Sequence, residues 1–186
     1  PFNYLQKRAM TLHASERVEH ALRRDFHYAF DENKHGGVPD IRLERVTDHV
    51  PFEAGSMTWH PLNVLHGELP IHGYRVDDVA YITDANNLPA PTMEALNGVD
   101  VLVLNALRPS PHYSHFSLRE AVEVAKVVGA RRTYFTHVSH LMGCHEKAEQ
   151  LLPEGMKFAY DGLALTRTVD GWEEQESMWL QQIRRP

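Results

Sequence analysis

The sequence contains a single cysteine, Cys144, among its 186 residues. An intrachain disulfide is therefore excluded, which is typical of proteins from a reducing compartment. The chain also lacks any apolar run near the roughly 20 residues that a membrane-spanning helix needs. Its first residues, "PFNYLQKRAM", contain no apolar core of a signal peptide and no initiator Met. From these absences we expect a cytoplasmic protein with no membrane partner.

Positive charge is sparse as well. Lys and Arg number 19 against 25 Asp and Glu, which gives a formal net charge of −6, and no stretch is rich in Lys or Arg. Because a nucleic acid the size of a tRNA needs many phosphate contacts, we expect a small molecule as the partner and not a nucleic acid. The length allows one domain with a substantial core. We expect a single domain over 1–186 with a charged tail at 170–186, partly helical or frayed.

The order of the apolar patterns predicts a layered α/β protein in which helices cover a sheet. Helices are expected at 14–30 with Ser15 as N-cap, at 117–130 with a Ser117–Glu120 capping box and Gly129 as terminator, and at 143–152. A polar segment with two glycines predicts a loop at 31–40. Strands are expected at 41–46, at 57–66 with Pro61 at an edge or bulge, at 73–84 as a hairpin turning at Asp77-Asp78, at 99–107, at 131–137, and at 156–168 as a closing pair.

Histidine is abundant, with 13 residues, and several histidines follow predicted strands. His66 ends "PLNVLH", Asp84 follows "VAYIT", "PHYSH" occupies 111–115, and "THVSH" occupies 136–140. Functional residues of α/β layers gather in the loops after strand ends. Imidazoles and a carboxylate suit a divalent cation. Each residue alone has an ordinary alternative as a turn residue or a satisfied polar group, but four such loops together favour one site.

The motifs "LHGEL", "HGYRVDDVAYITDANNLP", "PHYSHFSL", "YFTHVSHLMG" and "FAYDG", in this order, resemble the C-terminal portion of the metallo-β-lactamase-fold hydrolases. The resemblance covers about 57–165 and is strongest to the branch of the cyclic-phosphate phosphodiesterase of phosphonate breakdown and the tRNA 3′-processing endonucleases. It implies an αββα sandwich. The H-x-H-x-D-H run, with which the N-terminal half of that family supplies most metal ligands, has no counterpart in this sequence. We therefore expect a fragment without the first half of the fold, inactive alone and with little or no affinity for metal.

The resemblance also implies roles for individual residues around two divalent metal ions, Zn²⁺ or Mn²⁺. His66 would bind one ion, His137 the other, and Asp84 would bridge both. His115 falls at the position of the family's catalytic histidine, near the leaving group. The remaining two histidines, His112 and His140, match less closely and are expected either to contact the substrate or to support the ligands, with a structural role as the alternative.

For the intact protein, this resemblance predicts hydrolysis of a small or cyclic phosphodiester by a hydroxide that bridges two metal ions. A protonated His115 would assist the departing alkoxide. Two alternatives stay open: hydrolysis of a non-phosphate ester, thioester or lactam, and a catalytically incomplete half-domain that acts by association with a partner chain. A half-sandwich would expose a sheet edge and an apolar face, so we expect a dimer or larger assembly.

Overall fold

The structure is a computed structural model that describes residues 2–31 and 36–176. The chain divides into two compact units, 1–61 and 62–186. That residues 1–186 form a single domain stays a prediction. None of the helices within 2–31 and 36–176 is long and apolar enough to cross a membrane.

The first unit is built from short elements: α1 (Phe2–Gln6), β1 (Met10–Ala14), α2 (Glu16–Asp25), η1 (His27–Ala29), β2 (Ile41–Arg45) and β3 (Phe52–Ala54). β1 and β2 form a parallel pair. Ser15 caps α2 as predicted, because its Oγ accepts a hydrogen bond from the backbone N–H of Val18. The helix predicted at 14–30 is divided at Phe26, whose backbone (φ −118°, ψ 36°) leaves the helical region. Part of the loop predicted at 31–40 lies outside the described residues.

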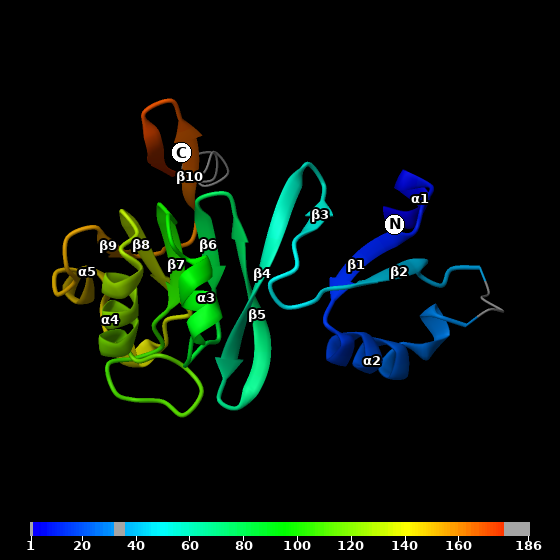
Figure 1. Ribbon diagram of the computed structural model, residues 1–186, viewed down its shortest axis with the longest axis horizontal. Helices are drawn as coiled ribbons and strands as arrows, with labels where there is room; N and C mark the ends of the chain where they lie inside the picture. Colours follow the sequence, from blue (N-terminus) through cyan, green and yellow to red (C-terminus); the bar gives the residue numbers. More distant parts are fainter. Residues whose placement is uncertain (1, 32–35, 177–186) are drawn as a thin grey trace, which may run out of the picture. The chain divides into compact units, whose positions relative to one another are not determined.

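The second unit contains a sheet with the strand order β4-β5-β6-β7-β8-β9 (Figure 1). Its strands are β4 (Met57–His66, which begins in the first unit), β5 (Leu69–Val76), β6 (Val79–Ile82), β7 (Val101–Asn105), β8 (Arg132–Thr136) and β9 (Met156–Phe158). β5 and β6 are antiparallel about the predicted Asp77-Asp78 turn, whereas β6, β7, β8 and β9 are parallel. Parallel strands end at the same edge of a sheet, so the loops that follow β6, β7 and β8 begin at one edge.

The strand pairing explains why a proline can stand at position 61, which was predicted to be an edge or a bulge. β3 pairs only with the first residues of β4, from Met57 to Trp59. Pro61 lies beyond that pairing but inside β4, which continues to His66. Proline has no backbone N–H to donate, so a position past the end of the β3 pairing suits it.

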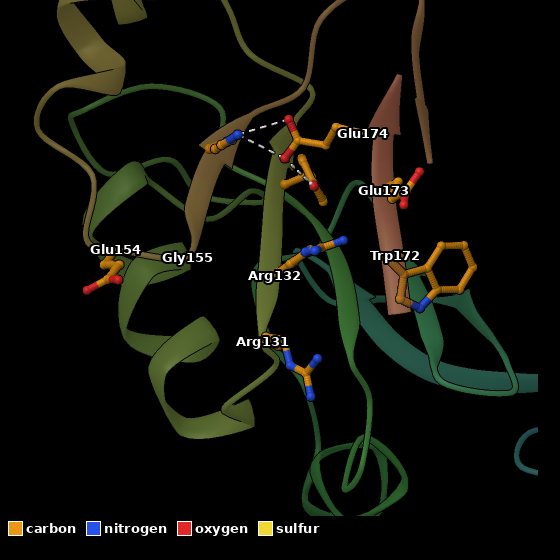
Figure 2. A pocket seen from close by; sticks show the side chains of 9 residues that line it. Arg131, Arg132, Glu154, Gly155, Trp172, Glu173 and Glu174 are labelled. Carbon is orange, nitrogen blue, oxygen red and sulfur yellow. Dashed lines mark hydrogen bonds and ion pairs between the residues drawn. The ribbon is translucent and has the colours of Figure 1, made fainter. Parts of the chain in front are cut away.

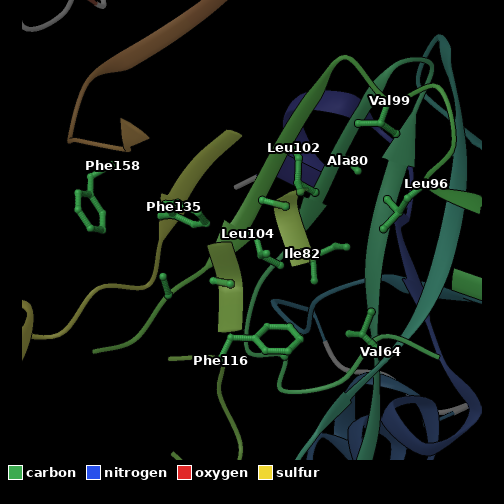
Figure 3. Packing of buried hydrophobic residues seen from close by; sticks show 14 of the residues in the cluster. Val64, Ala80, Ile82, Leu96, Val99, Leu102, Leu104, Phe116, Phe135 and Phe158 are labelled. Carbon is green, nitrogen blue, oxygen red and sulfur yellow. The ribbon is translucent and has the colours of Figure 1, made fainter. Parts of the chain in front are cut away.

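Helices α3 (Ala90–Ala95) and α4 (Leu118–Val128) pack on the sheet and bury the core of the second unit. Strand residues such as Ile82, Leu102 and Leu104 are fully buried against the helices and their connections, as Figure 3 shows with Leu96 and Phe116. Burial of this kind supplies most of the stability that fixes the strand ends.

The predicted signals at both ends of α4 are confirmed. Ser117 and Glu120 form a reciprocal capping box. Gly129 ends the helix in the left-handed conformation, with φ +69°, which costs glycine less than any residue that carries a Cβ.

Two predictions for the C-terminal region were wrong. Residues 156–168 do not form a strand pair, because β9 pairs with β8 while β10 (Leu163–Thr168) pairs with β11 (Gly171–Glu176) in a separate antiparallel sheet. The tail predicted as helical or frayed from 170 forms β11 over its first residues, and 177–186 lie outside the described residues. The predicted helix at 143–152 is present as the shorter α5 (His145–Glu149).

Candidate metal centre

Four loops of the second unit bring a carboxylate and several imidazoles together. His66 is the last residue of β4, and Asp84 follows β6 by two residues. His115 lies in the loop between β7 and α4, and His137 comes directly after β8. The convergence predicted from the strand ends is therefore present in the structure.

Asp84 is the residue that the neighbouring histidines share. Its Oδ1 lies 3.2 Å from Nε2 of His115 and 3.3 Å from Nε2 of His137. The imidazole rings of these two histidines are stacked, with centroids 4.9 Å apart. The Asp84 side chain is 41% exposed, so a metal ion or a substrate group can reach the carboxylate from solvent.

His66 completes the group from the other side. Its ring packs edge-on against that of His115, with centroids 4.8 Å apart. One ligand atom each from His66, Asp84 and His115 lie within 4.8 Å of one another. The most compact trio thus contains His115, which the resemblance assigns to catalysis, while the expected ligand His137 contacts the same carboxylate oxygen. The contacts of Asp84 admit either histidine as a ligand.

The Nδ1 side of His115 is held within its own loop. Nδ1 lies 3.0 Å from Oγ of Ser114 and 3.1 Å from Nδ1 of His112. Burial lowers the pKa of His115 below its usual value, and the nearby imidazoles lower it further, whereas the contact with Asp84 acts in the opposite direction. These contacts fix the orientation of the ring, with Nε2 directed towards Asp84.

Asp84 and His137 both adopt a backbone conformation that is uncommon for residues other than glycine. Their φ angles are +58° and +56°, in the left-handed region that side chains with a Cβ disfavour. Such strain persists only where surrounding contacts stabilise it, and it concentrates at functional sites. Here it turns the chain sharply at the end of two parallel strands.

A buried asparagine holds the turn at Asp84. Asn105, at the end of β7, accepts a hydrogen bond from the backbone N–H of Ala85 (2.8 Å) and donates one to its carbonyl (2.9 Å). Asn86 accepts from the backbone N–H of Gly67 (2.8 Å) and donates to the carbonyl of Tyr113 (3.1 Å). The loops that carry the metal-competent side chains are thus tied to one another through amides.

The two remaining predicted histidines differ in their placement. His112 lies within the group, through its contact with His115 and a ring-centroid distance of 4.9 Å from it. His140 begins the short helix η2 (His140–Met142). Within the described part of the chain, neither a hydrogen bond nor a ring contact connects His140 with the other site histidines. A role of His140 at the substrate stays a prediction.

The sequence interpretation missed three residues that support the site: Asn105, Asn86 and Ser114. Asn105 and Ser114 are 0% and 1% exposed. A polar residue at the end of the apolar run "VLVLN" was a usable signal, because a buried amide needs hydrogen-bond partners. The partners themselves lie far away in sequence, so their identity required the fold.

The donor set fits a divalent metal ion. Imidazole nitrogens and a carboxylate oxygen are the ligands of Zn²⁺ and Mn²⁺ sites in proteins. Ligand atoms about 2.0–2.2 Å from a common ion lie some 3–4 Å from each other, so the trio within 4.8 Å needs only small side-chain movements to enclose one. The contacts of Ser114 and His112 with Nδ1 of His115 are of the type that orients a ligand imidazole.

Comparison with known proteins identifies the family of the chain. The beta-lactamase superfamily domain matches residues 2–138, which extends the resemblance from about residue 57 towards the N-terminus. An octanoyltransferase of Porphyromonas gingivalis (strain ATCC BAA-308 / W83) is 31% identical over 157 residues, which are 84% of this chain and 32% of that protein. The chain therefore spans about a third of the length of this curated relative.

Solved structures give the same result. A diphosphatase from the PhnP family is 38% identical, with a TM-score of 0.74 over 84% of this chain and 57% of that chain. The short form of human tRNase Z has a TM-score of 0.56 over 84% of this chain and 67% of that chain, but its 13% identity supports only a common fold. The fold implies divalent metal ions at the site. The chain belongs to the beta-lactamase superfamily and has the metallo-β-lactamase fold predicted from its sequence.

Proposed function

We propose that the protein is a metal-dependent phosphodiesterase that hydrolyses a small or cyclic phosphodiester. The observation that carries this proposal is the convergence of His115 and His137 on one oxygen of Asp84, at 3.2 and 3.3 Å. The similarity to a diphosphatase at 38% identity supports phosphorus as the site of attack. The chain has 25 acidic and 19 basic residues, and this excess of negative charge supports a small substrate over a nucleic acid.

In this proposal, Asp84, His66 and His137 would hold divalent ions, Zn²⁺ or Mn²⁺, with the carboxylate of Asp84 shared between the ion of His66 and that of His137. When bound, the ions activate water and neutralise the phosphate charge. His66 and Asp84 keep their places because the amide of Asn86 connects the turn after His66 with the turn after Asp84. These residues contribute part of the ligand set that two such ions would need.

We assign to His115 the role of proton donor to the departing alcohol. Its Nε2 is directed towards Asp84, at the centre of the group, while Ser114 and His112 hold the opposite nitrogen. From this position Nε2 would donate a proton to the leaving oxygen as the P–O bond breaks. General-acid assistance of this kind is worth about 10²–10⁴-fold in rate.

A thioester hydrolase is the second candidate, since the relative from Porphyromonas gingivalis is named an octanoyltransferase. That name describes a protein of which this chain covers 32%, so we rank this candidate below the phosphodiesterase. The cytoplasmic location, the dimer and the incomplete half-domain predicted from the sequence also stay proposals. Light scattering of the purified protein would test the dimer, and a monomeric mass would contradict it.

The test of the proposed reaction is a substrate panel assayed with the purified intact protein and added Zn²⁺ or Mn²⁺. The panel contains bis(p-nitrophenyl) phosphate, a cyclic ribose phosphate and octanoyl-coenzyme A. We expect metal-dependent release of alcohol from the phosphodiesters and none of free thiol from the thioester. Thioester hydrolysis without phosphodiester hydrolysis would overturn the proposal in favour of the second candidate.

A further inference from the structure

A cavity of about 880 Å³ lies beside the sheet of the second unit, away from the histidines. Its lining comes from the start of β8, the start of β9 and strand β11, as Figure 2 shows. The size is in the range of small-molecule sites, about 300–1,000 Å³. Arg132 begins β8, whereas His137 follows the end of the same strand. At about 3.3 Å per residue, these two residues are roughly 16 Å apart, so a single phosphate group cannot contact both.

Three residues in the cavity, Lys157, Glu174 and Tyr134, form hydrogen bonds with one another. Lys157 donates to both carboxylate oxygens of Glu174, at 2.9 Å each, and the hydroxyl of Tyr134 donates to Oε1 at 2.7 Å. Burial raises the pKa of Glu174, but the hydrogen bonds from Lys157 and Tyr134 lower it more, so the net pKa is below the usual value. Glu174 is therefore ionised near neutral pH, and Lys157 compensates its charge.

Arg132 lies close enough to Glu174 to lower its pKa, but one donor atom of Arg132 and one of Trp172 have no such hydrogen bond. Nη1 of Arg132 and Nε1 of Trp172 are shielded from bulk water and have no hydrogen-bond acceptor among the described residues. Both atoms are donors only. In Figure 2 the Arg132 guanidinium extends from β8 towards β11, which carries Trp172, while Glu154 lies on the other side of β8.

Buried donors without acceptors are uncommon and call for an explanation such as a missing ligand. The ligand that satisfies them must bring acceptor atoms and no donors. A guanidinium suits the oxygens of a phosphate or carboxylate, which can accept two parallel hydrogen bonds. The indole N–H of Trp172 likewise needs an acceptor atom.

We propose that this cavity is a binding site for the oxyanion group of a small molecule, a phosphate or a carboxylate, held by Arg132 and Trp172. Lys157 stays paired with Glu174 and contributes to the wall of the site. The site is separate from the metal centre, so its occupation does not require a bound metal ion and does not depend on the proposed hydrolysis.

The experiment is a titration of the ¹⁵N-labelled chain with inorganic phosphate, and separately with acetate, at constant ionic strength. The indole N–H resonance of Trp172, assigned with Trp172→Phe, reports on the site. We expect a saturable shift with at least one anion, and the anion that produces it distinguishes a phosphate from a carboxylate ligand. Arg132→Gln should raise the Kd at least about tenfold, because a charged hydrogen bond is removed.

Arg119→Gln is the matched control, because Arg119 is an exposed residue of α4 outside the cavity and loses the same charge. It should leave the Kd of the anion nearly unchanged. If Arg132→Gln does not fold, calorimetry on Trp172→Phe decides, since an aromatic side chain is kept while the indole N–H is removed: weaker binding supports the site. The absence of a saturable shift from both anions, or equal affinity of the folded Arg132→Gln variant, would overturn the proposal.

Discussion

The side chain of Asn105 makes two hydrogen bonds to the backbone of Ala85, one as acceptor at 2.8 Å and one as donor at 2.9 Å. Both residues are fully buried. The pair joins the end of β7 to the residue that follows Asp84. A side chain that contacts neither metal nor substrate thus determines where the carboxylate lies.

Replacement of Asn105 by Ala is expected to damage both stability and the metal centre. It leaves the N–H of Ala85 without a partner in a buried site and removes one of the two hydrogen bonds to its C=O, which still accepts from the N–H of Phe116. The free energy of unfolding should therefore fall by roughly 2–4 kcal/mol. Loss of supporting hydrogen bonds typically weakens metal binding by about 10–100-fold. Urea unfolding and a Zn²⁺ titration would measure the two effects. Asn97→Ala, at an exposed position, is the control, and equal stability of the two variants would contradict the role of Asn105.

His115→Ala separates the two roles that the geometry allows for His115. If His115 donates the proton, the variant should keep the metal content of the wild type while its kcat falls by about 10²–10⁴-fold. If it is a ligand in place of His137, metal content should fall together with activity. We expect the first result. Metal analysis alongside the kinetics, with His137→Ala as the comparison, makes the assignment.

Replacement of Gly73 by Ala is expected to cause a steric clash in the sheet. A Cβ added at this position of β5 would lie 2.9 Å from Cγ1 of Ile82 and 3.2 Å from the carbonyl oxygen of Tyr81. Because Ile82 is fully buried and cannot move freely, Gly73→Ala should destabilise the protein by roughly 1–3 kcal/mol. Gly36→Ala, with no atom of the described residues within 4 Å of the new Cβ, should be close to neutral. Urea unfolding of both variants would test the difference, and equal midpoints would count against it.

Because of Tyr134, the folded protein is expected to lose stability at high pH. Burial and the hydrogen bond to Glu174 raise the pKa of Tyr134 above its usual value. A raised folded-state pKa contributes stability that is present below the unfolded-state pKa, about 10, and is lost as the pH rises above it. The unfolding free energy of the wild type should therefore fall more steeply above about pH 10 than that of Tyr134→Phe.

The matched control for Tyr134→Phe is Tyr81→Phe, because Tyr81 is half exposed and its removal leaves the Tyr134 hydroxyl bonded to Glu174. Its pH profile should follow that of the wild type. Parallel profiles for all three proteins would mean that the Tyr134–Glu174 contact does not contribute to folding.

The strands and the strand-end positions of the site residues could be predicted because they depend on local patterns. Apolar runs define β6, β7 and β8, and their parallel order brings Asp84 and His137 to one edge. The caps of α4 also depend on nearby residues, Ser117 and Gly129. Predictions of this kind need no knowledge of distant contacts.

The errors concern features that distant contacts decide. Residues 156–168 contain two strands, but they do not pair with each other: β9 joins the parallel sheet through β8, which is distant in sequence, and β10 pairs with the next strand, β11. The charged composition of 171–176 favoured a frayed tail, yet Glu174 gains its partners from Tyr134 and Lys157. The hydrogen bonds of Asn105 could not be predicted from the sequence either, because its partner Ala85 is distant along the chain.

The most direct test of the metal centre is the metal content of the intact protein, as wild type and as Asp84→Ala, after dialysis against Zn²⁺ and removal of free ions, measured by elemental analysis. Since Asp84 is the carboxylate that His115 and His137 share, the wild type should retain Zn²⁺ and Asp84→Ala should retain none. Retention of the wild-type stoichiometry by the folded variant would contradict the central role of Asp84.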